Sequence, residues 1–95
     1  MQYEWDDVKA AANLRKHRVD FLDAITALED ANRVEVLDSR FSYGEEQVQV
    51  IGRGSRGLLF VVMTLRGEDT CRIISARRAT RHEENRYHAG QRESW

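Results

Sequence analysis

The sequence predicts an α+β domain in which an N-terminal strand and a two-helix hairpin precede an antiparallel sheet of three to four strands and a C-terminal helix. Three observations predict it. Apolar residues recur at helical spacing between residues 7 and 28. Beyond residue 47 the period changes to two, as strands require. Thr80 followed by Glu83 then has the spacing of a capping box, because hydroxyl and carboxylate each accept one otherwise unpaired backbone N–H of a helix start.

The N-terminal third of the chain holds one strand and two helices. The aromatic alternation of Tyr3–Trp5 suits a first or edge strand, and Asp6 is a good N-cap for a helix over Asp7–His17. Asp20 caps a second helix through about Leu28, so the two helices form a hairpin. On a helical wheel the first helix has an apolar side with Val8, Ala11, Ala12 and Leu14, opposite a polar side with Lys9, Asn13, Lys16 and His17.

The middle of the chain changes from irregular structure to strands. Residues 33–38 are a strand or an irregular segment, and residues 39–46 read as a loop. Residues 47–51 alternate apolar and polar side chains, which predicts a strand. The glycine-rich stretch 52–57 ends that strand and forms a connection.

The C-terminal half completes the sheet and adds the last helix. Leu58–Leu65 is apolar except for Thr64, the pattern of a central strand covered on both faces. A turn at residues 66–69 leads to a third meander strand, Thr70–Ala76, and the helix runs from Arg81 to about Ala89, where Gly90 ends it. The predicted core includes Phe21, Ile25, Val48, Val50, Leu59, Val61 and Ile73.

Composition narrows the class of protein. A chain of 95 residues suits one domain, residues 1–95, that buries roughly 60 to 65% of its unfolded surface. Fifteen Lys and Arg face sixteen Asp and Glu, a net charge of -1, so any basic site must be local. The single Cys71 cannot close an intramolecular disulfide, no apolar run reaches the ~20 residues of a membrane helix, and the N-terminus lacks a signal-peptide layout. We therefore expect a soluble cytoplasmic protein.

A cluster of arginines at the end of the third meander strand is the most informative feature. In that strand Cys71, Ile73 and Ser75 should point to one face, with Arg72, Ile74 and Ala76 on the other. Arg77 and Arg78 should then leave the sheet together, next to the start of the last helix. Positive side chains beside a helix N-terminus favour an anion.

Each residue of this chain that could carry chemistry also has a purely structural interpretation. Arg77 and Arg78 can be solvated charges, and Arg72 can pair with a carboxylate across strands. His17 can offset the dipole at the end of its helix, which is worth ~0.3 to 1 kcal/mol when exposed. Other structural roles are capping by Glu83, packing of Tyr87 against the sheet, polar-face positions for Lys9 and Lys16, and a core position for Cys71. The histidines lack a close metal-ligand spacing, since His82 and His88 are six residues apart, and we expect neither metal nor cofactor.

Several short strings occur in a recognisable order. They are Tyr3–Asp6, Asn13–His17 before Val19–Phe21, Gly44–Glu46, Ile51–Gly52, and Arg72–Arg77 with Ala79, Glu83 and Tyr87. In order and spacing they resemble the BrnT family of type II toxin-antitoxin toxins, small ribonucleases with a fold similar to RelE. Two positions depart from the family pattern: Arg18 stands where glycine is usual, and Gln47 stands where an arginine commonly follows the two glutamates.

The resemblance implies metal-independent RNA cleavage, in which the 2′-hydroxyl attacks the adjacent phosphate and translation is inhibited. Such chemistry needs a base, a proton donor for the leaving oxygen, and cations for the charge on the phosphorane. Arg77 and Arg78 suit the last role because a guanidinium forms two hydrogen bonds to one phosphate. Histidine titrates near pH 6.5, so His17 can transfer a proton near neutrality. Lys16 would add charge, Glu46 or Glu83 would act as base, and the candidate RNA-binding residues are Lys9, Arg72, Arg81 and Tyr87.

The resemblance also implies a protein partner, a ribbon-helix-helix antitoxin that neutralises the toxin and carries the promoter-DNA contacts of a complex that represses its own operon. With a net charge of -1, the positive potential should concentrate in one patch. The patch should hold Lys9, Lys16, His17, Arg72, Arg77, Arg78 and Arg81, with Asp6, Asp7, Glu29, Asp30, Glu68 and Asp69 elsewhere or at its border. The alternative is a non-catalytic module that uses the same patch to bind nucleic acid or protein.

Overall fold

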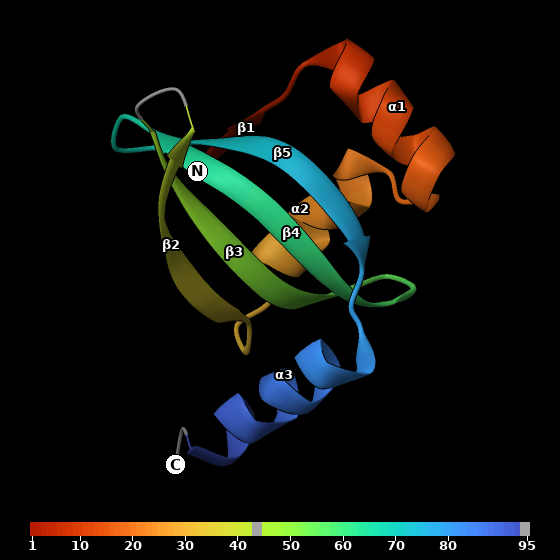
Figure 1. Cartoon of the computed structure of the whole chain (residues 1–95), viewed down its shortest axis with the longest axis vertical. Coiled ribbons are helices and arrows are strands. Elements are labelled where there is room, and N and C mark those ends of the chain that lie inside the picture. Colours follow the sequence, from red (N-terminus) through yellow and green to blue (C-terminus); the bar gives the residue numbers. More distant parts are fainter. Residues whose placement is uncertain (43–44, 94–95) are drawn as a thin grey trace.

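A computed structural model describes residues 1–42 and 45–93, and the side chains of residues 1–36 and 47–90. Within these residues the chain forms three helices and a five-stranded mixed sheet, an α+β architecture (Figure 1). In chain order the elements are β1 (Gln2–Glu4), α1 (Asp7–His17), α2 (Phe21–Leu28), β2 (Val34–Ser42), β3 (Glu45–Gly54), β4 (Gly57–Arg66), β5 (Thr70–Arg78) and α3 (Arg81–Glu93). None of the described helices is both long and apolar enough to cross a bilayer.

The apolar strand β4 lies at the centre of the sheet, as its sequence predicts. The strand order is β1-β5-β4-β3-β2. Strands β2 to β5 are antiparallel neighbours, which confirms the predicted meander of β3, β4 and β5. The N-terminal strand joins the same sheet at its edge, parallel to β5, with Tyr3 opposite Cys71.

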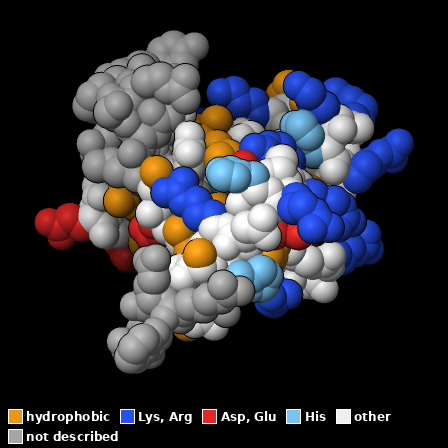
Figure 2. All heavy atoms as spheres, turned by 60° about the horizontal axis from the view of Figure 1, so that its bottom comes forward, with side chains coloured by type: hydrophobic (Ala, Val, Ile, Leu, Met, Phe, Trp, Pro, Cys, Tyr) orange, Lys and Arg blue, Asp and Glu red, His pale blue; other side chains and the backbone are white. Residues whose placement is uncertain are grey.

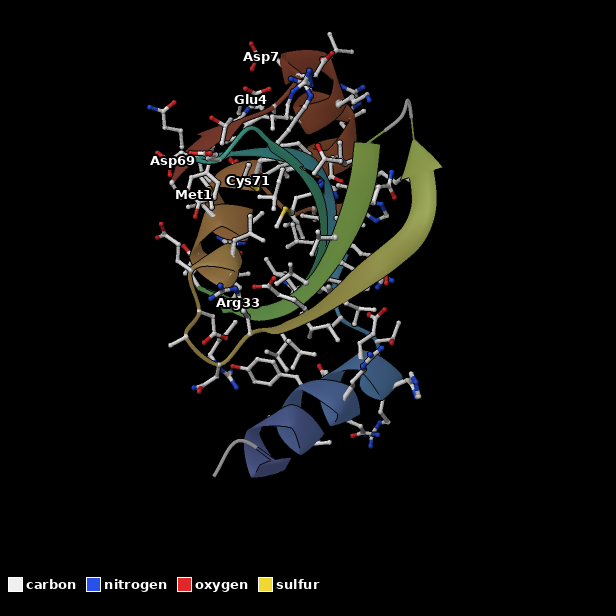
Figure 3. The ribbon with its side chains drawn as sticks, turned by 90° about the vertical axis from the view of Figure 1, so that its left-hand side faces the viewer. Met1, Glu4, Asp7, Arg33, Asp69 and Cys71 are labelled. Carbon is white, nitrogen blue, oxygen red and sulfur yellow. The ribbon has the colours of Figure 1, made fainter. Side chains whose placement is uncertain are left out.

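Helices α1 and α2 cover one face of the curved sheet, and α3 packs at one end of the other face. Phe21 and Ala24 of α2 are buried against Val50 and Val61 of the sheet. Figure 3 shows the Cys71 side chain pointing into the space enclosed by the sheet and α2. Cys71 is buried, and burial raises the pKa of its thiol to about 11, so the sulfur stays protonated in the core. A second, smaller core forms under α3 from Ile51, Leu58 and Tyr87.

The predicted core residues are confirmed. Ile25 is half-buried and packs against the main cluster. The others are fully buried: Phe21, Val48, Val50, Leu59, Val61 and Ile73.

Several predicted boundaries are wrong because strand pairing extends the elements. The predicted loop over residues 39–46 is strand up to Ser42 and again from Glu45, while residues 43–44 lie outside the described residues. The connection over residues 52–57 is shorter, since Gly54 pairs with Gly57 and leaves only a two-residue turn. Helix α3 continues through Gly90, where a side chain would meet Val34 Cγ2 at 2.9 Å. Gly90 therefore allows a close approach to β2 and is not a helix end.

The orientation of α1 is the reverse of what its helical wheel suggests. Val8 is 77% exposed and Leu14 45% exposed, whereas Asn13 is buried. The Asn13 amide donates to the carbonyl oxygens of Ala76 (2.8 Å) and Val19 (3.0 Å), and its Oδ1 accepts from the Ala76 N–H at 3.1 Å. Unpaired backbone groups in the core cost about 1–3 kcal/mol each. This polar requirement decides which side of α1 faces β5.

A β-bulge at Ile74 reverses the predicted faces of the second half of β5. The ladder with β4 pairs Met63 with Ile73 but Val62 with Ser75, so one residue of β5 is extra. Ala76 is consequently fully buried on the same face as Ile73, and the expected alternation through Ala76 is wrong. Arg77 and Arg78 still belong to β5 and point to opposite faces, so they do not leave the sheet together.

Candidate active site

Arg77 is held in one position at the end of β5. Its guanidinium lies over the ring of Phe60, its cross-strand neighbour, with 4.2 Å between the guanidinium carbon and the ring centroid. Its two terminal nitrogens donate to the two carboxylate oxygens of Glu83, both at 2.9 Å. This pairing raises the pKa of Arg77 above its usual value. The side chain remains 35% exposed, so a charged and oriented group faces solvent.

The predicted capping box at the start of α3 is confirmed and positions Glu83. The Glu83 N–H donates to Thr80 Oγ1 at 3.2 Å, and the Thr80 N–H donates to Glu83 Oε1 at 2.8 Å. Burial pushes the pKa of the Glu83 carboxyl upward, but the hydrogen bonds from Arg77 and the Thr80 N–H outweigh it and hold the pKa below its usual value of 4.5. Glu83 thus links the helix start to Arg77.

The lowered pKa of Glu83 predicts a stability effect at acid pH. A carboxyl with a depressed pKa in the folded state stabilises the fold above its unfolded pKa, and this contribution is lost as pH falls through the folded value. The free energy of unfolding of the wild-type protein should therefore exceed that of the Glu83→Gln variant by a constant amount near neutral pH. This difference should shrink as the pH drops below 4.5. Urea unfolding of both proteins between pH 7 and pH 3 measures this difference; equal differences at both ends would contradict it.

Arg78 lies at the same end of β5 but on the face of the sheet that α1 and α2 cover. It is exposed, it pairs with Leu59 in the ladder, and its Nη1 donates to the Arg56 carbonyl oxygen at 3.4 Å. No carboxylate among the described residues pairs with it. Arg81, the first residue of α3, is exposed close by in sequence.

The C-terminal end of α1 brings His17 and Lys16 toward this region. The hydrogen bonds of Asn13 to Ala76 fix α1 against the end of β5, and His17 follows one turn later on the same helix face. His17 is half-buried and forms no hydrogen bond to another described residue, while Lys16 is exposed. Figure 1 shows the end of α1 beside the end of β5, with α3 starting just below.

Positive charge gathers on this side of the molecule. In Figure 2, Lys and Arg side chains cluster on the right, the side on which the end of α1, the β3–β4 turn and the start of α3 lie in Figure 1. Figure 3 places Asp69 beside Met1 and Asp7 beyond Glu4, both far from α3. We call this region the arginine end, defined by His17, Arg56, Arg77, Arg78 and Glu83.

Other predicted members of the basic patch lie elsewhere. Arg72 is five residues before Arg77 in β5, about 15 Å away at the rise of a strand. Its Nη1 donates to Glu4 Oε2 at 2.7 Å, which confirms the cross-strand ion pair. Lys9 is exposed in the first turn of α1, at the opposite end of that helix from His17. One continuous patch is therefore not formed.

Tyr87 and Glu46 are two further candidates that the sequence suggested. Tyr87 is 1% exposed, and its hydroxyl donates to Asp30 Oδ2 at 2.6 Å, which ties α3 to the turn after α2. The predicted packing of Tyr87 against the sheet is confirmed. Its buried ring has no exposed face on which an RNA base could stack. The Glu46 side chain lies outside the described side chains, so its role as base stays a prediction.

Sequence reasoning missed Phe60 and Arg56. Phe60 sits inside an apolar run that gives no hint of its exposed half or of its arginine neighbour, and Arg56 reads as an ordinary turn residue. The β4–β5 register places Phe60 opposite Arg77, and the β3–β4 turn places the Arg56 carbonyl oxygen within hydrogen-bond distance of Arg78. Among the described residues no three His, Cys, Asp or Glu side chains are grouped closely enough to hold a metal ion.

Comparison with known proteins shows to which family the chain belongs. The family model for the BrnT ribonuclease toxin of type II toxin-antitoxin systems matches residues 5–83, which include Arg77 and the capping box. The chain belongs to the BrnT toxin family. Its fold is similar to the crystal structure of the Brucella abortus ribonuclease toxin BrnT, with 23% identity and a TM-score of 0.62 over 85% of this chain and 99% of that chain. No curated protein matches the sequence.

Membership of the BrnT family makes the chain, at the level of the family, a ribonuclease toxin of a type II system. RNA is the corresponding substrate, and an antitoxin protein is the corresponding partner. All five residues that define the arginine end lie within the matched region.

Proposed function

We propose that this BrnT family member is a single RelE-like domain that cuts RNA internally without a metal ion, by attack of a 2′-hydroxyl on the adjacent phosphate, and so inhibits translation in the cytoplasm. The observation that supports this most directly is the fixed guanidinium of Arg77, stacked on Phe60 and paired with Glu83, with Arg78 as the next residue at the same end of β5. Preorganised cations are the group that a phosphorane transition state needs most.

Arg77 and Arg78 are the proposed phosphate-binding residues. Negative charge grows on the phosphorane oxygens as the 2′-hydroxyl attacks, and a cation already oriented stabilises it without reorganising. Arg78 has no carboxylate partner among the described residues, so the N–H groups that do not bind the Arg56 carbonyl oxygen are available to a phosphate. Both oxygens of Glu83 are engaged by Arg77, and its pKa is lowered, which makes it a weak base. We therefore assign Glu83 to positioning Arg77 and not to proton abstraction.

His17 is the proposed proton-transfer group, and Lys16 adds charge next to it. Imidazole gives and takes a proton near neutral pH, and His17 has no hydrogen-bond partner among the described residues that would fix its tautomer. Glu46 remains the other proposed base.

Purified protein, made by cell-free synthesis, should shorten a single-stranded RNA in EDTA and leave 2′,3′-cyclic phosphate and 5′-hydroxyl ends. In the same assay His17→Ala should lower the rate and flatten its dependence on pH between 5 and 8. A shift in RNA mobility with no shorter product would instead favour the non-catalytic binding module.

The proposed partner is a ribbon-helix-helix antitoxin, and the proposed complex represses its own operon. A molecule with a net charge of -1 has little general attraction to DNA, so promoter contacts belong to the antitoxin. The toxin then acts as a corepressor.

A further inference from the structure

A groove of about 490 Å³ lies beside the arginine end, between the end of α1, the start of α2 and the β3–β4 turn. Leu14 of α1 and Leu22 of α2 both line it, and they are 45% and 64% exposed. The buried Val19 lies between them in the chain and contributes to the same lining. Two large aliphatic side chains from different helices thus converge on one hollow that the fold leaves uncovered.

The far wall of the groove is held in place by hydrogen bonds. Asp23 Oδ1 accepts from the Ser55 N–H at 2.8 Å and from the Ser55 hydroxyl at 2.6 Å. These bonds tie α2 to the β3–β4 turn, where a side chain in place of Gly54 would come within 3.0 Å of Asp23 Oδ2. The groove is therefore preformed, which lowers the ordering cost of binding a partner.

Two arginines and two aspartates line the groove, so its formal charges balance. Arg18 and Arg56 line it, and neither forms an ion pair with a described residue. The acidic residues of the lining are already engaged, because Asp20 caps α2 through the Leu22 N–H and Asp23 binds Ser55. Arg18 adopts φ +60°, a left-handed conformation that costs a non-glycine residue roughly 1–2 kcal/mol. The chain thus carries a cation at the rim where glycine would be less strained.

We propose that this groove is the docking site of the antitoxin, and that it receives an apolar side chain of the antitoxin between Leu14 and Leu22 while Asp or Glu residues beside that side chain pair with Arg18 and Arg56. The two exposed leucines, and the two arginines that form no ion pair with a described residue, carry the assignment. Leucine offers no flat ring on which a nucleotide base stacks, and the carboxylates of Asp20 and Asp23 in the same lining repel a phosphate backbone, so a protein fits this groove better than RNA.

The position of the groove accounts for neutralisation. The Arg56 carbonyl oxygen, at the rim, accepts from Arg78 at the arginine end. A polypeptide anchored between the leucines therefore lies next to Arg78, one of the two proposed phosphate-binding residues, and covers it. The inference rests on the proposed function only in naming the antitoxin as occupant.

Leu22→Asp is the test variant and Val8→Asp the matched control. Both residues are exposed and apolar, and both lie near a helix N-terminus, where aspartate is tolerated, but Val8 is outside the groove. The probe is the purified antitoxin encoded beside the toxin gene, titrated calorimetrically. Leu22→Asp should raise the Kd at least about tenfold, and Val8→Asp should leave it unchanged. Leu14→Gln probes the opposite wall, and thermal unfolding verifies that each variant is folded.

RNA cleavage by each free toxin variant separates the outcomes. Weaker antitoxin binding with unchanged cleavage supports the docking site. Unchanged antitoxin affinity in both groove variants overturns it, and an accompanying loss of cleavage would reassign the groove to RNA. If the wild-type protein cleaves no RNA but Leu22→Asp still weakens antitoxin binding, the proposed function fails and the docking site stands.

Discussion

Replacing Arg77 with alanine should slow RNA cleavage about 10²- to 10³-fold while the protein stays folded, the loss typical of one transition-state donor. The side chain is fixed by Phe60 and Glu83 and still exposed, so its removal deletes an oriented charge and little core packing. Arg77→Lys should recover only part of the rate, because an ammonium keeps the charge and lacks the planar fork. Cleavage rates on one RNA at a fixed salt concentration measure the effect.

Arg33→Ala is a matched control for the loss of a paired arginine. Arg33 binds Glu35 at 2.7 Å and is 38% exposed, close to the 35% of Arg77, but it lies just before β2, away from the arginine end. Its variant should cleave RNA at the wild-type rate. If Arg77→Ala and Arg78→Ala both remain fully active and toxic, these residues do not belong to the active site.

Gly52→Ala should destabilise the fold by about 3 kcal/mol or more, at the upper end of what overpacking costs. A Cβ at Gly52 would overlap the Ala27 carbonyl oxygen and lie 2.8 Å from the carbonyl carbon of α2. Because the clash is with backbone, the whole helix must move off β3 and lose the packing of Phe21 and Ala24. At about 4–8 °C per kcal/mol, the melting temperature should fall by ~12–24 °C.

Gly67→Ala is the matched control for losing a glycine. Gly67 has φ +71° and nothing within 4 Å of the added carbon, so its variant carries only the backbone strain of a left-handed alanine. If Gly52→Ala lowers the melting temperature no more than Gly67→Ala does, the close approach of α2 to β3 does not limit stability.

Local patterns predicted much of this protein. Asp6 and Asp20 cap α1 and α2 as expected, and the Thr80–Glu83 capping box starts α3 at Arg81, because each of these signals acts within four residues. The run Leu58–Leu65 is central because a strand covered on both faces needs apolar residues throughout. The match of the BrnT family model to residues 5–83 likewise rests on the sequence alone.

Features that depend on residues far apart in sequence were decided only by tertiary structure. Asn13 and Ala76 are 63 positions apart, yet their hydrogen bonds turn the polar side of α1 inward and expose Leu14 to the groove. The bulge in β5 follows from its register with β4, and it sends Arg77 to Phe60 and Arg78 to the opposite face. No periodicity within one segment contains this information, because an unpaired backbone group is satisfied by whichever distant residue the folded chain brings to it.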